Sequence, residues 1–263
     1  MFLDFFKTSP VLDKESIQWQ FELYEWALRH FDASIFFHYS QLVEPSNQFF
    51  PGRANSSEEM AQLIFSKVKK YAALSHWPCY LSSKMSTENS CRTQPVKVIV
   101  SGNLRTINGV EPDYVLLENR LPIIYDPRQV NNPEAIIATF AHTLAHHLAS
   151  MAPEAPPGGA ENWPHAIEVL AVFLGFGLMF ANSAFVYKNI TCGSCQPTTI
   201  DRTAWLSQYD ITYSLAIFCV LKDIPAKHAT KNIKKSLRSY FKKAYKDVQK
   251  QSSQLEKLKT LNR

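Results

Sequence analysis

The chain contains 263 residues, of which 46% are hydrophobic and 19% are charged, together with only eight glycines. This composition excludes an intrinsically disordered chain and a collagen-like one, and the length suffices to bury a large apolar core. The formal net charge of +5 is unevenly distributed, because residues 222–263 hold 13 of the 28 basic side chains and only three of the 23 acidic ones.

The first half of the chain combines helices with short strands. Residues 13–31 repeat apolar side chains at three- and four-residue steps, which predicts an amphipathic helix. Ser56 and Glu59 form a capping-box pattern at the start of a second helix, which is expected to reach about Leu74. Runs rich in β-branched and aromatic residues then predict strands at residues 96–100, 114–117 and 123–125.

The second half is predicted to be mainly helical. Asn132 followed by Pro133 is a typical helix start, and this helix is expected to end near Met151. Further helices are expected at residues 163–184, 201–221 and 226–249, followed by a C-terminal tail that frays. The order of elements predicts an α+β fold in one domain. Its parts are a helical N-terminal part at residues 1–95, a core at residues 96–222, and a basic C-terminal helix with its tail at residues 223–263.

Residues 169–187 contain no charged side chain, and 19 residues is at the lower limit for crossing a bilayer. Asn182 and Ser183 interrupt the apolar run, and no basic cluster flanks it to orient a membrane span. The sequence therefore predicts a buried core helix and no membrane span.

The cysteines and the first residues indicate a cytoplasmic protein. Residues 1–7 place an acid at position four and no basic segment before an apolar run, so no secretory signal is predicted. Five scattered cysteines are typical of thiols kept reduced. Cys192 and Cys195 form a single CxxC motif. Together with Cys79 and Cys91 it could form a four-sulfur zinc site, and the alternative is that the motif lies in an ordinary loop.

Four of the eight histidines, His142, His146, His147 and His165, lie within 24 residues. His142 and His146 are four residues apart on a predicted helix, so both imidazoles project from one face and could bind one metal ion. Residues 135–153 contain no Asp, Glu, Lys or Arg, which predicts that this helix is buried on all sides.

An acidic residue follows on the next predicted helix. Glu168 opens the long uncharged stretch, and a buried carboxylate has a solvation cost that a metal ion or a histidine would offset. Two histidines from one helix and a glutamate from the next form a three-ligand zinc set with one open position. The alternative is that His142 and His146 are structural and hydrogen-bonded within the core.

Residues 120–222 resemble the zincin metallopeptidases, in which a helix carries HExxH and a following helix often supplies a third ligand, Glu. Here His142-Thr143-Leu144-Ala145-His146 stands in place of that motif, His147 follows it, and Glu168 occurs 22 residues after His146. Uncharacterised bacterial zincin-like proteins have HExxHH followed by an acidic residue that opens a similar Phe- and Gly-containing helix. The resemblance implies zinc held by His142, His146 and Glu168.

The chain departs from this family at one position. The family's Glu, the general base that activates the attacking water, is replaced by Thr143, whose hydroxyl cannot act as a base near neutral pH. His147 and His165 are expected beside the metal ligands. Either of them, or Glu161, could substitute for the missing base. The motif thus favours a protein that does not cleave peptides.

The basic segment is predicted to be a helix docked on the core. Apolar residues recur at helical steps, and lysines fill the remaining positions. The tyrosines Tyr240 and Tyr245 interleave with these lysines, a pattern that also occurs in nucleic-acid-binding surfaces. If this surface contacts a partner, the expected contact residues are Lys234, Lys235, Arg238, Lys242 and Lys243.

Three functions follow from the sequence. The first is a catalytically impaired, zincin-like protein that retains zinc and acts by binding a protein or peptide, or by regulating it. The second is an active zinc hydrolase with a displaced base, and the third is a metal-free interaction protein that uses the basic helix. A protein or peptide partner is favoured over nucleic acid, and both stay open.

Overall fold

The computed structural model describes residues 11–83, 103–111, 116, 119–183 and 205–262. These residues form mostly helices, with one two-stranded parallel sheet. The predicted α+β class with an excess of helix is therefore confirmed.

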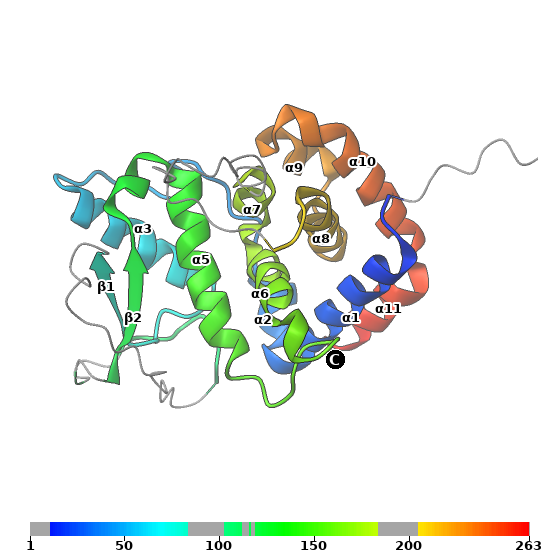
Figure 1. The fold of residues 1–263 in the computed structure, drawn as a ribbon, viewed down its shortest axis with the longest axis horizontal. Coiled ribbons are helices and arrows are strands. Elements are labelled where there is room, and N and C mark those ends of the chain that lie inside the picture. Colours follow the sequence, from blue (N-terminus) through cyan, green and yellow to red (C-terminus); the bar gives the residue numbers. More distant parts are fainter. Residues whose placement is uncertain (1–10, 84–102, 112–115, 117–118, 184–204, 263) are drawn as a thin grey trace, which may run out of the picture.

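Helix α5 (Pro133–Ala149) occupies the middle of the fold. Figure 1 shows the sheet and α3 (Ser57–Tyr71) on one side of α5, and α6 (Trp163–Ala171), α7 (Gly177–Ser183) and α8 (Gln208–Leu221) on the other. The predicted start of α5 is confirmed, because the Asn132 side chain accepts a hydrogen bond from the Ala135 backbone N–H and Pro133 is the first helical residue.

The two helices predicted in the N-terminal part are present, and the predicted cap Ser56 is confirmed; the short helix that follows the first one was not predicted. Asp13 caps α1 (Lys14–His30) by accepting from the Ser16 N–H, and α2 (Ala33–His38) follows directly. Ser56 caps α3 through the Glu59 N–H. In a capping box the Glu59 carboxylate would accept from the Ser56 N–H. Here it accepts from the Asn55 N–H, one residue earlier, so only the Ser56 half of the predicted capping box is formed.

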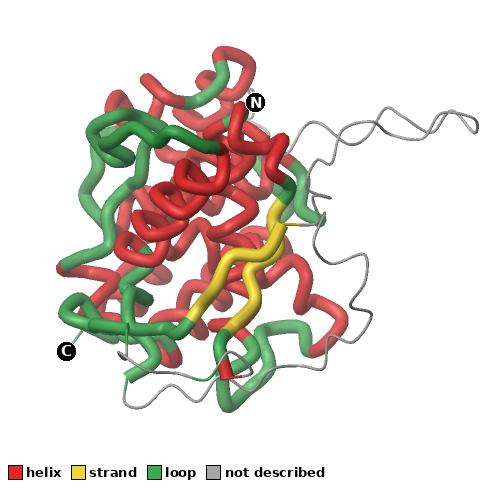
Figure 2. The backbone as a smooth tube through the Cα atoms, turned by 90° about the vertical axis from the view of Figure 1, so that its left-hand side faces the viewer, coloured by secondary structure: helices red, strands yellow, loops and turns green. Residues whose placement is uncertain are grey.

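The sheet pairs β1 (Cys79–Ser83) with β2 (Leu121–Tyr125), with Cys79 opposite Leu121. Figure 2 shows both strands at one side of the helical body. The strand predicted at residues 123–125 is part of β2, whereas β1 was not predicted. The strand predicted at 96–100 lies outside the described residues. Of the strand predicted at 114–117, only residue 116 is described, and it is not in a strand.

The helix predicted at residues 163–184 is interrupted. A 3-10 turn (Ala160–Asn162) leads into α6, a π-helical segment (Val172–Phe176) follows, and α7 completes the run. Gly175 has φ +104°, and a Cβ there would collide with the carbonyl oxygen of Gln41, so only glycine fits. The Val43 N–H donates to the Gly175 carbonyl at 3.0 Å and holds this close approach.

The hydrogen bonds of Asn182 explain why a polar residue interrupts the apolar run. Its side chain is buried and donates to Glu134 Oε1 at 3.1 Å and to the Asn232 carbonyl at 2.9 Å, while its Oδ1 accepts from the Lys234 N–H. It therefore connects α7 to α5 and to the junction of α9 (Ala226–Asn232) and α10 (Lys235–Lys250).

The C-terminal helices differ from the prediction in three ways. The helix predicted at 201–221 begins later, at α8, where Ser207 and Asp210 form a capping box. The helix predicted at 226–249 is two helices, because Ile233 and Lys234 are extended. The predicted fraying is wrong: α11 (Ser252–Thr260) buries Leu255 and Leu258.

One helix of the described chain, residues 160–183, is long and apolar enough to cross a membrane. In its most apolar window, 94% of the residues are buried inside the protein. The described residues therefore do not form a protein with many membrane spans, and this helix serves as the interior of the fold.

Candidate functional site

Three of the four predicted histidines lie along one side of α5. We call this side the histidine face and define it as His142, Thr143, His146 and His147. His146 is exposed and the other three are half-buried, while Leu144, Ala145 and Leu148 are buried on the other sides of the helix. The prediction that α5 is buried on all sides is therefore wrong. Its outward positions hold imidazoles and a hydroxyl in place of charged side chains, which made the helix resemble a core element.

His142 and His146 are one turn apart, which is a rise of about 6 Å along the helix. The His146 and His147 rings meet edge to face with centroids 5.4 Å apart. Partial loss of water lowers the pKa of His146, and burial, with a smaller contribution from His146, lowers the pKa of His147 to about 4. These lowered pKa values favour the neutral form of His146 and His147, which is the form of an imidazole that binds metal ions.

Thr143 is the residue at the position of the family's general base. Its hydroxyl donates to the Thr139 carbonyl one turn earlier, at 3.0 Å. This bond within the helix uses the one proton that the hydroxyl can donate, and a hydroxyl has no basic form near pH 7. Thr143 therefore has a structural contact and no means of activating water.

Glu168, the predicted third ligand, is completely buried in α6. Its carboxylate accepts backbone N–H bonds from Leu206 at 2.9 Å and from Trp205 at 3.4 Å. These bonds hold the chain just before α8 against α6. The sequence showed that a buried acid needs partners, but it did not show that backbone amides 37 and 38 residues away would provide them.

His165 and Glu161 lie at the beginning of this helical run. The His165 ring contacts Trp205 with centroids 6.0 Å apart, and its Nδ1 is buried without a hydrogen-bond partner among the described residues. It lines an open pocket of about 310 Å³ together with Trp19 and Asn162. Glu161 is exposed in the 3-10 turn before α6.

Within the described ranges, no three His, Cys, Asp or Glu side chains are grouped closely enough to hold a metal ion. The structure thus brings His142 and His146 onto one helical face without gathering Glu168 to them as a ligand set. The spacing of the two histidines on α5 is the one that a helix uses to offer two ligands to one metal ion, and the three-ligand zinc site stays a prediction. Cys91, Cys192 and Cys195 lie outside the described residues, so the four-sulfur alternative also stays open.

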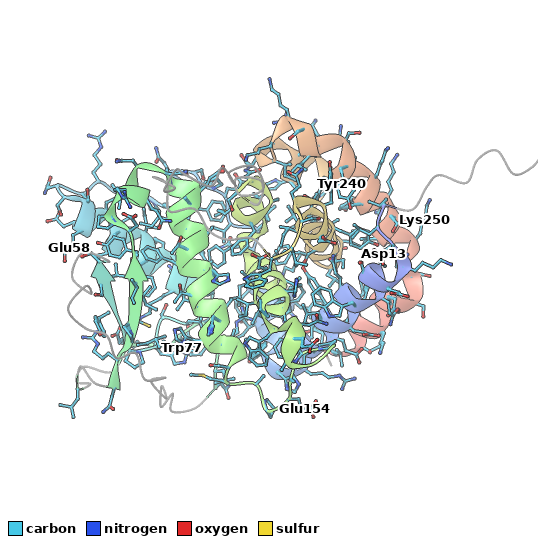
Figure 3. The ribbon with its side chains drawn as sticks, viewed as in Figure 1. Asp13, Glu58, Trp77, Glu154, Tyr240 and Lys250 are labelled. Atoms are coloured by element: carbon cyan, nitrogen blue, oxygen red, sulfur yellow. The ribbon has the colours of Figure 1, made fainter. Side chains whose placement is uncertain are left out.

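The basic helix is α10, at the end of the molecule opposite Glu58 of α3 (Figure 3). All five members of the predicted apolar stripe are buried, which confirms it: Leu237, Phe241, Ala244 and Val248 lie on α10, and Ile233 lies in the extended break before it. Four of the predicted partner-binding residues are exposed without an ion-pair partner in the described part of the chain: Lys234, Lys235, Lys242 and Lys243.

Arg238, the fifth predicted contact residue, has a different environment. It is half-buried, and its guanidinium donates to the carbonyls of Ile233 at 3.0 Å and Lys231 at 3.1 Å. Arg238 therefore stabilises the break between α9 and α10, where backbone carbonyls lack helical partners. We call the four exposed lysines the basic face.

Comparison of the chain with protein-family models, with curated proteins and with solved structures found no match. The resemblance to zincins accordingly rests on the motif residues alone.

Proposed function

We propose that this chain is a zincin-like binding protein that lacks efficient peptidase activity and holds a divalent transition metal ion, zinc in the first place, through His142 and His146. The observation that carries the proposal is the pairing of these imidazoles, one turn apart on the outward side of α5, with a threonine between them that has no basic form. A zinc ion there would supply a cationic docking point for an acceptor group of a protein or peptide partner.

Glu168 is the third ligand in this proposal only if its carboxylate can bind a metal as well as two amides. A carboxylate can accept more than two bonds, because each oxygen has two lone pairs, so the bonds to the two amides do not by themselves exclude a metal ligand. The same amides support the alternative in which Glu168 is purely structural and the histidine pair is completed by a partner's side chain or by solvent. A cytoplasmic location belongs to the proposal too, and the buried free thiols of Cys79 and Cys219 agree with it.

Elemental analysis of protein purified without a histidine tag tests the metal component. We expect close to one equivalent of zinc per chain in the wild type, and a loss of most of it in His142→Ala and His146→Ala. His38→Ala is the matched control, because His38 is a helical histidine on α2 whose Nδ1 bonds to the Ser34 carbonyl. Zinc content near zero in the wild type, or unchanged by both variants, rejects the proposal.

Thr143→Glu tests why hydrolysis is lost. If the missing base is the main cause, this variant loaded with zinc gains peptide-hydrolysing activity that the wild type lacks. If Thr143→Glu stays inactive while it retains zinc, the loss of activity has further causes. Clear hydrolysis by the wild type, abolished in Glu161→Gln, would instead favour the second candidate, an active hydrolase with a displaced base.

A further inference from the structure

The open pocket beside His165 lies between the first turns of α1, the beginning of α6 and the segment just before α8. Helices α1 and α6 pack against each other here (Figure 1). The volume of about 310 Å³ is at the lower end of the range for pockets that bind small molecules. Six described residues form the wall: Glu15, Ser16, Trp19, Asn162, His165 and Leu206.

Glu15 gives this pocket a negative charge that is accessible to a ligand. Its side chain is exposed, and its carboxylate forms no hydrogen bond or ion pair with another described residue. Glu25, on the same helix, is by contrast paired with Arg29 and Lys257. No Lys or Arg occurs among the described residues of the wall, so the pocket favours a cationic ligand.

The hydrogen-bond donors of two wall residues are already occupied. The Ser16 hydroxyl donates to Asp13 Oδ2 at 2.7 Å, which leaves only its acceptor lone pairs. The Trp19 indole N–H donates to the Pro157 carbonyl at 2.9 Å, so Trp19 can offer the pocket its ring but no donor. The Asn162 side chain, which does not cap α6, adds an amide oxygen. The wall is therefore rich in acceptors and suits a ligand that donates several hydrogen bonds.

Aromatic rings narrow the choice of cation. The Trp205 ring is 56% exposed and contacts the His165 ring, with centroids 6.0 Å apart. The Trp205 and Leu206 N–H groups donate to the Glu168 carboxylate, which fixes the backbone that carries this ring at the mouth of the pocket. Tryptophan rings attract cations, and a guanidinium is planar, stacks on such rings and donates in parallel to a carboxylate. The pocket thus favours a guanidinium over an ammonium group.

We propose that this pocket binds the guanidinium group of an arginine side chain from a protein partner. Glu15 is the counter-ion, the Trp19 ring lies beside the guanidinium, and Trp205 at the mouth contacts the arginine stem and the residues next to it. Because the pocket is open and Trp205 stays exposed, the arginine enters from a chain that remains on the surface. The site uses neither His142 nor His146 and is independent of the proposed metal site.

Three capped tripeptides test the ligand: Ala-Arg-Ala, Ala-Lys-Ala and Ala-citrulline-Ala. Each is titrated into the full-length protein with a chelator present, and binding is followed by the shifts of the Trp19 indole N–H and the Ser16 and Leu206 amides. We expect saturable binding of the arginine peptide. The lysine peptide should bind about threefold more weakly, and the citrulline peptide, which has the same shape without the charge, about tenfold more weakly. Methylguanidinium, which lacks the contacts with Trp205, should bind about fivefold more weakly than the arginine peptide.

Two variants test the assigned contacts, and both are exposed positions whose change should leave circular dichroism as in the wild type. Glu15→Gln keeps the shape of the side chain and should weaken the arginine peptide about fivefold, the effect of one exposed ion pair in good geometry. Trp205→Leu should weaken it about threefold. Glu22→Gln is the control, because Glu22 lies on the same side of α1 about two turns further on, and it should bind as the wild type does.

The proposal is overturned if the arginine peptide does not saturate the wild type, or if Glu15→Gln binds it with wild-type affinity. It is also overturned if the citrulline or lysine peptide binds as tightly as the arginine peptide, which would exclude a guanidinium site. Methylguanidinium binding as tightly as the arginine peptide would exclude a protein partner as the source of the group. Since all titrations contain chelator, none of these outcomes bears on the metal site.

Discussion

Helices α5 and α10 are nearly equal in length, with 17 and 16 residues, and both bury an apolar side, yet their outward sides differ completely. The outward side of α5 carries imidazoles with lowered pKa values and a hydroxyl, whereas that of α10 carries exposed lysines. Lysines at such positions keep a docked helix solvated, as on many surface helices. The concentration of charge in residues 222–263 therefore indicates a surface, while the neutral helix carries the residues on which the proposed metal site rests.

The largest effect is expected where α10 is anchored. Phe241 is completely buried against the core, so Phe241→Ala should lower the free energy of unfolding by about 3–4 kcal/mol. Urea denaturation measures this, and Lys242→Ala at the neighbouring exposed position is the control, with a change below about 0.5 kcal/mol. Equal effects of the two variants would show that α10 is not docked as described.

Glu168 allows the structural and metal-binding roles to be separated. Glu168→Ala leaves the Trp205 and Leu206 amides without their acceptor and should lower the free energy of unfolding by about 3 kcal/mol, measured in urea with a chelator present. Glu168→Gln keeps one acceptor oxygen and should cost about half as much. A change below about 1 kcal/mol for Glu168→Ala would contradict the anchoring role.

A pH-dependent effect of intermediate size is expected at α5. His147 has a folded pKa of about 4, below the ordinary value of 6.5, so between pH 6.5 and 4 the unfolded chain binds a proton that the folded chain does not. Stability should therefore fall as the pH drops through this window, and the His147 contribution should amount to about 2 kcal/mol, less than the full shift implies because the ring is partly solvated.

Unfolding of the wild type and His147→Gln in chelator, at several pH values, measures this contribution. The two proteins should differ in slope between pH 6.5 and 4 and run parallel at higher pH. Parallel curves over the entire range would mean that His147 titrates normally. An NMR titration of the imidazole protons gives an independent value of the pKa.

The smallest effect on stability is expected on the basic face. Replacing Lys234, Lys235, Lys242 and Lys243 together by Gln should change the free energy of unfolding by less than about 0.5 kcal/mol. The same variant tests the third candidate function. If the basic face binds an anionic partner, the wild type should bind a single-stranded oligonucleotide or heparin with an affinity that falls steeply with salt, and the variant should not. Binding that is insensitive to salt would exclude this use of the basic face.

Local patterns in the sequence predicted much of the fold. Ser56 and Asn132 cap helices where expected, because capping depends on residues three positions apart. Contacts between distant segments were not predictable: the break at Gly175 depends on Gln41, and α11 is stabilised by burial of Leu255 and by the ion pair of Lys257 with Glu25 at 2.6 Å.

The candidate site was predicted in part for the same reason. The helical spacing of His142 and His146 follows from the sequence, and so does the loss of the base at Thr143. The amide partners of Glu168 depend on tertiary packing, and no local signal reveals them.

A Co²⁺ titration tests the central proposal most directly, because a metal ion held by imidazoles changes the visible absorption spectrum. The proposal predicts saturation at one equivalent in the wild type, at least about tenfold weaker binding in His142→Ala and His146→Ala, and wild-type affinity in His38→Ala. Equal affinities in all four proteins, or no saturable change in the wild type, would contradict a metal site on the histidine face.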